Sequence, residues 1–426
     1  MNRGRAGELD STRWSGSRLA PSLNSGMGEA TPIGLATLRP CRSGLPNQVF
    51  PPADTLVCDS NPAVASPHLM VAVGAQNYGQ NSYRIRQPFD FSQRTGKIVF
   101  DTDATVESGL IGWISLEVTE DPTNAPTFML ASGNDESGAV PRNAVELQFQ
   151  NNCTISTGTP GVSLRMVQVY TNYRSTTHWP PQSAPCVPTQ RDHLNHFEVR
   201  LSQQNVEVWA TPASADGRSF QSPVLMYSTA VNLPFARGYV SITTHNHASL
   251  KYSTNNTMDA WVTRWDNVGF DGPVVANWRE YEVADSLTPG NYAADHAGPA
   301  VSVGYLVSDA ANGPAQTLRL HNVDTANAVS ARLSVSAWYL TSAAFGANPP
   351  KFVLRYRFNG KAWHDRLLTA GELGVLAEGN GQIGQMLDVP LSDLVQGDNT
   401  LEFVTSNVPQ GYPPFVQNID LVIQTR

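Results

Sequence analysis

The sequence predicts an all-β protein of two β-sandwich (jelly-roll) domains, and three observations carry this prediction. Charged residues make up only 15% of the 426 residues. Glycine (33) and proline (30) break the chain often, and short runs rich in Val, Thr, Tyr and Trp recur between the breaks. No segment longer than about ten residues has a convincing helical period. For this length, two domains are the natural expectation.

The chain divides by composition into four stretches. Residues 1–45, rich in Gly, Ser, Pro and Arg, are expected to be largely disordered. The first sandwich is expected over 46–273, a linker over 274–300 and a smaller sandwich over 301–426. Strands of the first sandwich are predicted at 68–73, 81–86, 96–101, 112–119, 144–150, 163–170, 196–201, 206–210, 238–244 and 260–268. Strands of the second are predicted at 316–320, 331–339, 351–358, 386–390, 400–405 and 416–423, with one brief helix at 369–376.

Four cysteines occur as two pairs that are close in sequence and lack CxxC spacing, Cys41 with Cys58 and Cys153 with Cys186. Two local disulfides are expected, with free buried thiols as the alternative. Disulfides place the protein in an oxidising compartment, extracellular or periplasmic. Residues 1–40 contain no apolar run of signal-peptide length, so no export signal is visible in this chain.

The charge balance excludes some partners. A formal net charge of −8 and a pI near 5.6 leave no basic stripe to neutralise phosphates, so neither nucleic acid nor an anionic membrane surface is expected as a partner. No stretch approaches 18 apolar residues, so membrane insertion is not expected either. The sequence leaves the oligomeric state open.

Several predicted strands alternate between apolar and polar side chains, which places the polar ones on one face of a sheet. The face combines an aromatic platform, carboxylates, amides, a guanidinium and imidazoles, a mixture that suits the ring faces and hydroxyls of a sugar. The alternative is an ordinary solvated face without a ligand. The candidate ligand-binding residues are Arg84, Trp113, Gln148, Tyr239, His245 and His247, and the candidate catalytic residues are Glu117 and Glu146.

Four stretches of the first domain resemble the concanavalin A-like lectin/glucanase superfamily, over about residues 46–273: 83–91, 196–199 with 206–209, and the closing 265–270. The resemblance implies two stacked, curved antiparallel sheets with a polysaccharide or other glycan held on the concave one. The turn Gly397-Asp398-Asn399 and the last strand make the second domain similar to galactose-binding-like jelly rolls. A likeness of fold does not by itself establish an activity.

Three carbohydrate functions are compatible with the candidate residues. A glycoside hydrolase would use Glu117 and Glu146 if their strands are neighbours, although the Glu-x-Asp-x-x-Glu strand of family 16 glucanases is absent. A polysaccharide lyase would use Arg84 as the cation and Tyr239 with His245 for proton transfer. A lectin needs no catalytic pair. An adhesion or surface-structural protein, with no ligand on the polar face, stays open as a fourth interpretation.

Metal binding is a weaker expectation. His245 and His247 share a strand face and would suit zinc or copper, but the sequence shows no third ligand. Asp266 is the expected ligand of a structural calcium ion, since the resemblance places a ligand on this final strand, and a bond to local amides is the alternative. No cofactor is required by any of these functions.

Overall fold

The computed structural model confirms the all-β prediction, because its sheets are built of antiparallel strands. The chain forms two compact units. Unit 1 contains residues up to Glu120, Asn143–Thr171 and Ser175–Val274, and unit 2 contains the rest. The residues described are 14–19, 69–74, 80–103, 112–122, 140–154, 158, 160–190, 193–216, 219–246, 260–271, 275, 277–283, 304–306, 317–338, 353–377, 382–406 and 415–426.

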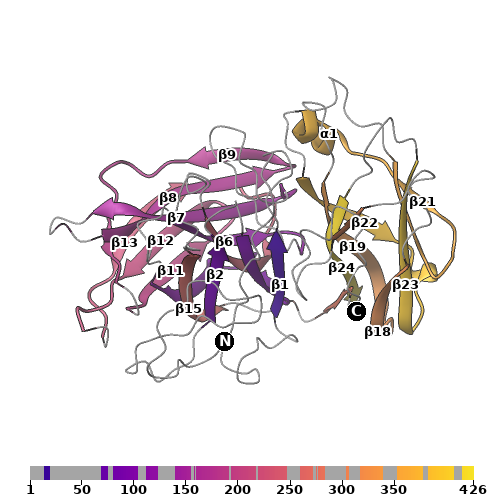
Figure 1. Ribbon diagram of the computed structural model, residues 1–426, viewed down its shortest axis with the longest axis horizontal. Coiled ribbons are helices and arrows are strands. Elements are labelled where there is room, and N and C mark those ends of the chain that lie inside the picture. Colours follow the sequence, from indigo (N-terminus) through magenta and orange to yellow (C-terminus); the bar gives the residue numbers. More distant parts are fainter. Residues whose placement is uncertain are drawn as a thin grey trace. The chain divides into compact units, whose positions relative to one another are not determined.

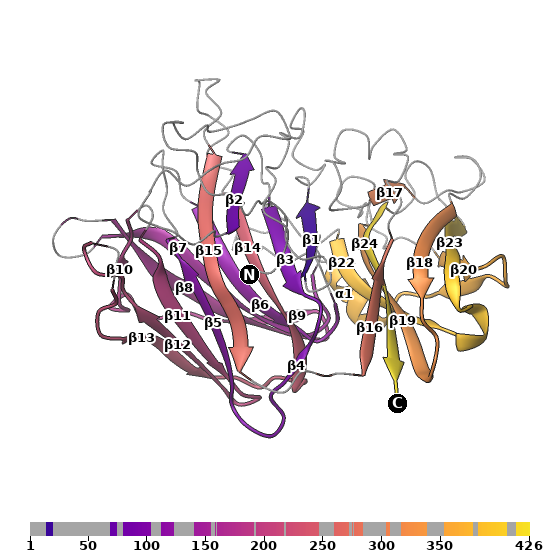
Figure 2. The same ribbon diagram turned by 90° about the horizontal axis from the view of Figure 1, so that it is seen from below.

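Unit 1 is a sandwich of two sheets (Figures 1 and 2). The nine-stranded sheet has the order β1 (Trp14–Leu19), β3 (Gln80–Ile85), β14 (Arg237–Asn246), β6 (Gly112–Thr119), β7 (Ala144–Thr154), β8 (Pro160–Thr171) and β10 (Val187–Pro188), with β4 (Phe89–Asp90) paired to β14 and β9 (Arg174–His178) to β8. The six-stranded sheet has the order β13 (Val224–Ala230), β12 (Asn205–Thr211), β11 (Asn195–Leu201), β5 (Gly96–Thr102), β15 (Ala260–Asp271) and β2 (Leu69–Gly74).

The two sheets pack through aromatic rings. Phe149 of the nine-stranded sheet meets Phe100 and Phe197 of the six-stranded sheet, with ring centroids 5.8 and 5.1 Å apart. Phe100 also packs against Trp265, which is 1% exposed. Since alternate residues of each strand point into this core, the intervening polar residues of β6, β7 and β14 lie on the opposite face of their sheet.

The disulfide predicted between Cys153 and Cys186 is present, with the two Cα atoms 6.0 Å apart. It passes over Gly161 of β8, which pairs with Cys153 on one side and with Pro188 on the other. A Cβ atom at position 161 would lie only 2.3 Å from Cys186 Sγ, so glycine is required here. Cys41 and Cys58 lie outside the described residues.

We expect Gly161→Ala to lower the free energy of unfolding of unit 1 by about 1–3 kcal/mol, because the added methyl overpacks the disulfide. Gly269→Ala is the matched control, since a Cβ atom there meets nothing within 4 Å. Thermal unfolding of both variants under oxidising conditions checks this. Equal midpoints for the two variants would contradict the packing described.

Unit 2 contains two smaller antiparallel sheets and one helix. The five-stranded sheet has the order β16 (Trp278–Glu282), β24 (Phe415–Thr425), β19 (Ala328–Trp338) and β22 (Gln382–Val389), with β17 (Gly304–Leu306) paired to β24. The four-stranded sheet has the order β18 (Thr317–Val323), β23 (Gly397–Ser406), β20 (Val353–Phe358) and β21 (His364–Arg366). The helix is α1 (Ala370–Ala377), followed by a short 3-10 turn, η3 (Leu391–Asp393).

Two segments that lie far from residue 275 in the sequence belong to unit 2, namely Asp121–Arg142 and Asn172–Arg174. In the first segment, the Pro122 carbonyl accepts a hydrogen bond from Ser334 Oγ at 2.9 Å, and Val140 forms a bridge to Ile383. The second segment is a turn in which Asn172 and Tyr173 both have positive φ, 47° and 68°. Such a conformation is uncommon for a bulky residue and persists only where surrounding contacts enforce it.

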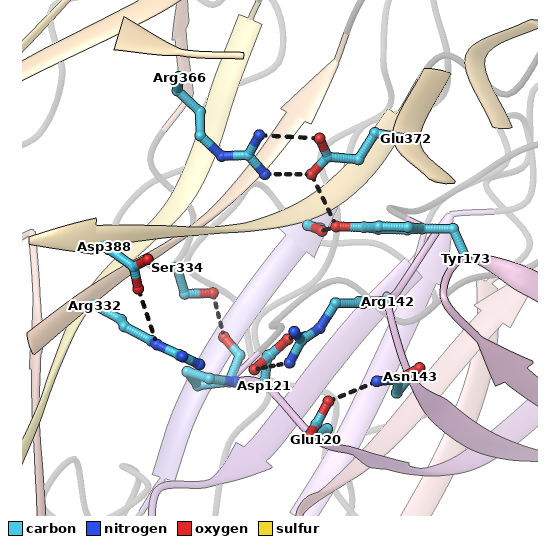
Figure 3. A network of polar contacts seen from close by, with 12 residues as sticks. Glu120, Asp121, Arg142, Asn143, Tyr173, Arg332, Ser334, Arg366, Glu372 and Asp388 are labelled. Atoms are coloured by element: carbon cyan, nitrogen blue, oxygen red, sulfur yellow. Dashed lines mark hydrogen bonds and ion pairs between the residues drawn. The ribbon is translucent and has the colours of Figure 1, made fainter. Parts of the chain in front are cut away.

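The contacts of Tyr173 hold it in this conformation (Figure 3). Its hydroxyl lies 3.0 Å from Glu372 Oε1 and 2.9 Å from the Gly384 carbonyl oxygen. The Arg366 guanidinium donates two hydrogen bonds to the Glu372 carboxylate, to Oε1 at 2.5 Å and to Oε2 at 3.1 Å. With Thr369 it forms a capping box at the start of α1, since each residue's side chain accepts the other's backbone N–H.

Two short strands lie in stretches where the sequence predicted none. Residues 14–19, within the stretch expected to be largely disordered, form β1 and pair with β3. Residues 278–282, within the stretch expected to be a linker, form β16 and pair with β24. The brief helix predicted at 369–376 is confirmed as α1. No helix in the described part of the chain has the length and apolarity needed to cross a membrane.

Candidate functional site

A row of polar residues crosses five adjacent strands of the nine-stranded sheet, on the face opposite the core. Each member is the direct cross-strand partner of the next, so the side chains stand side by side. Glu117 and Glu146 are opposite each other on β6 and β7, as the hydrolase interpretation requires. We call these five residues the polar row: Arg84 (β3), Ser241 (β14), Glu117 (β6), Glu146 (β7) and Gln168 (β8).

The polar row is buried, with between 1% and 4% of each residue exposed. The same holds for Ser115, Gln148 and Thr243 one step along the strands, at 0–2%. A face that serves only solubility would leave such side chains in water. The solvated-face alternative therefore does not describe this part of the sheet.

Glu146 is the best defined carboxyl of the polar row. Its Oε1 accepts hydrogen bonds from Ser115 Oγ at 3.1 Å and from Gln148 Nε2 at 2.9 Å. Burial raises the pKa of Glu146 from 4.5 to about 7, against the lowering effect of these two hydrogen bonds and of the Arg165 charge. A carboxyl with this pKa exchanges its proton near neutral pH, which is the property of a general acid or base.

Arg165 is a member of the site that the sequence analysis missed. The pairing of β7 with β8 shifts between Gln148 and Phe149, whose partners are Met166 and Leu164, so Arg165 is the extra residue of a β-bulge. Burial lowers the pKa of Arg165, and the charge of Glu146 raises it. Strict alternation could not have predicted the position of this residue, because the bulge breaks the alternation.

Four buried side-chain oxygens on this face have no hydrogen-bond partner in the part of the chain that the structure describes. A buried acceptor without a donor is costly, typically by about 1–3 kcal/mol. These four oxygens could therefore each accept a further hydrogen bond. The four atoms are Glu146 Oε2, Gln148 Oε1, Gln168 Oε1 and Ser241 Oγ.

The other predicted ligand-binding residues lie on the same sheet. The Arg84 guanidinium carbon is 5.0 Å from the centre of the Tyr239 ring, and both residues are buried. Trp113 and His245 are cross-strand partners on β6 and β14, one step beyond Ser115 and Thr243. The side chains of Trp113 and His245, and the whole of His247, lie outside the described residues.

The calcium prediction at Asp266 stays a prediction. Asp266 Oδ1 accepts the backbone N–H of Asn267 at 2.8 Å, the local bond weighed as the alternative. Its cross-strand partner Asp101 contacts His196 Nδ1 and Asn267 Nδ2, each at 2.6 Å. Among the described residues, no group of three or more His, Cys, Asp or Glu side chains is placed to hold a metal.

In unit 2, an aromatic residue of β20 is part of the core. Tyr356 is 5% exposed and its hydroxyl donates to the Asp388 carbonyl oxygen. Arg357, on the other face of β20, lies over the Trp363 ring at 4.4 Å and pairs with Glu402 at 2.7 Å. These charged groups satisfy one another, so this face of β20 offers less to a ligand than the polar row does.

The raised pKa of Glu146 predicts a pH-dependent stability. Between pH 4.5 and 7 the folded protein binds a proton here that the unfolded chain releases, so stability is full below pH 4.5 and falls as pH rises through 7. From pH 4 to pH 8 the wild type should lose about 3 kcal/mol relative to Glu146→Gln. Urea unfolding of both proteins at the two pH values measures the difference. Parallel pH profiles would contradict the burial of this carboxyl.

No protein-family model and no curated protein sequence matches the chain. Among solved structures, the chain is similar to the VIP36 exoplasmic/lumenal domain in its Ca2+/Man3GlcNAc-bound form, at 14% identity over 47% of this chain and 78% of that one, with a TM-score of 0.29. A Bacteroides ovatus mixed-linkage glucan GH16 protein in complex with a G4G4G3G product matches at 8% identity over 62% and 96%, with a TM-score of 0.35.

An alginate lyase from Pseudomonas aeruginosa matches at 8% identity over 48% of this chain and 83% of that one, with a TM-score of 0.28. All three likenesses have TM-scores below 0.5. At such identities and TM-scores they carry no argument about what this chain binds or does. The galactose-binding-like fold of the second domain stays a prediction.

Proposed function

We propose that unit 1 binds a glycan on the polar row and hydrolyses a glycosidic bond there, with Glu146 as the proton donor and Glu117 as the second carboxylate. The observation that carries the proposal is the buried, directly opposed pair Glu117 and Glu146. Amide, hydroxyl and guanidinium groups surround the pair, and such groups provide the polar contacts that orient sugar hydroxyls.

The register favours the closer of the two spacings that glycosidases use. Directly opposed residues of an antiparallel pair have Cβ atoms about 4.5–5.5 Å apart, and retaining enzymes hold their carboxyl groups about 5–5.5 Å apart. In this mechanism Glu146 protonates the departing glycosidic oxygen while Glu117 attacks the anomeric carbon. Glu146 then takes a proton from the water that releases the sugar from Glu117.

A lectin is the second candidate, favoured by the amides Gln148 and Gln168 beside the carboxyl pair. A lectin would use the same contacts for binding and would leave the glycan intact. The lyase interpretation has less support, because Arg84 is stacked on Tyr239 at 5.0 Å. As an adhesion or surface-structural protein, the chain would bind no glycan on this face.

A panel of polysaccharides incubated with the full chain tests the proposal, with reducing ends and the absorbance of unsaturated uronates followed together. A rise in reducing ends alone supports hydrolysis, and a rise in both signals supports a lyase. Retention on an affinity gel without product would leave a lectin. Because the polar row is buried, long incubations belong in the design.

The place of action that we propose is extracellular or periplasmic. The Cys153–Cys186 disulfide supports this, because structural disulfides persist in oxidising compartments. The domain limits 46–273 and 301–426, and a calcium ion at Asp266, remain part of the proposal. Mass spectrometry of the natural protein without reduction tests the disulfide in its native compartment.

A further inference from the structure

We infer that two copies of this chain associate through the last strand of the six-stranded sheet, with β13 of one copy paired antiparallel to β13 of the other. The inference does not depend on the polar row, which lies on the other sheet. We call β13 (Val224–Ala230), together with the exposed rings of Trp179 and Phe220, the β13 edge.

Exposed apolar side chains are concentrated at the β13 edge. Of the eight large apolar side chains exposed in the described part of the chain, four lie here: Trp179 and Phe220 at 54%, Leu225 at 40% and Val224 at 36%. The Tyr227 hydroxyl donates to the Trp179 carbonyl oxygen at 3.3 Å, which places Trp179 beside β13. Single exposed apolar residues are ordinary, but a group of them on one element marks an interaction surface.

The strand itself lacks the features that prevent edge strands from pairing. Natural proteins protect an edge with charged residues, with proline or with a very short strand. β13 is seven residues long and contains neither a charged residue nor proline. Its pairing with β12 has a bulge at Met226, and residues 227–230 after the bulge pair regularly. Among the described strands, β12 alone pairs with β13, so the stretch 227–230 is open to a further strand.

The backbone of this stretch presents hydrogen-bonding groups outward. The Val231 N–H donates to the Gln204 carbonyl oxygen at 2.9 Å, and these two residues continue the register of β12 with β13. Bonded and non-bonded pairs alternate along an antiparallel ladder. The N–H and C=O groups of Thr229 therefore point toward β12, and those of Ser228 and Ala230 point away from it. Both of these residues are exposed, so their backbone groups can pair with a further strand.

A second copy of β13 matches this edge in hydrogen bonds and in charge. A two-fold axis at Thr229 places Ser228 and Ala230 of one copy opposite Ala230 and Ser228 of the other, so that each outward N–H meets an outward carbonyl. The facing side chains are small and uncharged, and Ser228 is opposite Glu207 only on the β12 side. Because the chain carries a net charge of −8, two copies repel each other overall, and a neutral edge is where they approach most easily.

The size of the β13 edge predicts a weak dimer. An aromatic side chain has about 150–250 Å² to bury, so the two half-exposed rings leave about 200 Å² in water. Each partner of a standard interface buries about 800 Å². Leu225, Val224 and the paired backbone add to the area of the rings, but the interface stays at the small end of the range. We therefore expect a dissociation constant in the micromolar range.

Analytical ultracentrifugation of the full chain from about 1 to 200 µM tests the association. We expect a concentration-dependent equilibrium between monomer and dimer. Ser228→Lys and Leu225→Lys should each weaken the dimer at least about tenfold, because each brings two positive charges together at the edge. Val329→Lys is the matched control, since Val329 is 45% exposed on β19 of unit 2, and it should leave the equilibrium unchanged. Circular dichroism checks that each variant keeps the fold.

Hydrogen exchange of the wild type at single-residue resolution, at both ends of this concentration range, tests the strand pairing itself. The Ser228 and Ala230 amides should exchange fast in the dilute protein and slowly in the concentrated one, while the Thr229 amide stays protected in both. A protein that stays monomeric up to about 200 µM would overturn the inference, as would a dimer that neither β13 variant weakens. Protection of both amides in the dilute protein would show that the chain covers its own edge, and would overturn it too.

Discussion

Glu146→Gln should lower the rate of glycosidic hydrolysis by about a hundred- to ten-thousandfold while glycan binding is kept. Glutamine preserves the shape of the side chain, and its carbonyl oxygen still accepts from Ser115 and Gln148, which now contact Glu146 Oε1. It cannot give or take the proton that departure of the sugar requires. The measurement is reducing-end release on the substrate that the panel identifies.

Glu198→Gln is the matched control for this variant. Glu198 lies on β11 of the other sheet, is half-buried, and pairs with Lys97 and Arg200, whose side chains are exposed. Its replacement should leave the rate within about twofold of the wild type, because Glu198 lies on a different sheet from the polar row. Equal rates in Glu146→Gln and the wild type would remove Glu146 from the mechanism. If Glu146→Gln loses glycan binding as well as hydrolysis, Glu146 contacts the ligand but has no acid–base role.

Arg366→Met should destabilise unit 2 by about 3–5 kcal/mol. Glu372 is fully buried, and the Arg366 side chain is 16% exposed. Removal of the guanidinium leaves a buried carboxylate with the Tyr173 hydroxyl and the Thr369 N–H as its remaining donors. Hydrogen exchange of the β22 amides, which report the opening of unit 2, measures the loss.

Arg355→Met provides the comparison for this prediction. Arg355 lies 2.6 Å from Asp365, close to the 2.5 Å between Arg366 and Glu372, but this pair is at the surface. It should cost at most about 1 kcal/mol. The double variant Arg366→Met with Glu372→Gln should recover part of the loss, because the stranded charge is gone. If Arg366→Met costs no more than Arg355→Met, the buried contacts of Arg366, Glu372 and Tyr173 drawn in Figure 3 do not stabilise unit 2.

The strands of unit 1 were predictable because their side chains alternate over several residues. The alternation of 112–119 and 144–150 placed Glu117 and Glu146 on polar faces, and the pairing of β6 with β7 confirmed the condition that their strands be neighbours. Alternation within a strand does not determine how that strand pairs with its neighbour. The sequence therefore could not predict that the two carboxyls are directly opposite each other or that they are buried.

Other features depended on tertiary contacts that no local pattern reports. The bulge at Arg165 inserts one residue into β8, and the charge of Glu146 raises the pKa of this arginine. Tyr173 adopts a left-handed conformation because of its bonds to Glu372 and the Gly384 carbonyl, which are about 200 residues away in sequence. Strand β16 was read as linker because five residues of mixed polarity give too short a signal.

A structure of the protein with a bound oligosaccharide tests the central claim most directly. The account predicts that the sugar lies across β14, β6, β7 and β8, with hydroxyls within hydrogen-bond distance of Ser241 Oγ, Glu146 Oε2 and Gln168 Oε1. A sugar bound on unit 2, or on unit 1 without contact to the polar row, would contradict the assignment of this row as the glycan site.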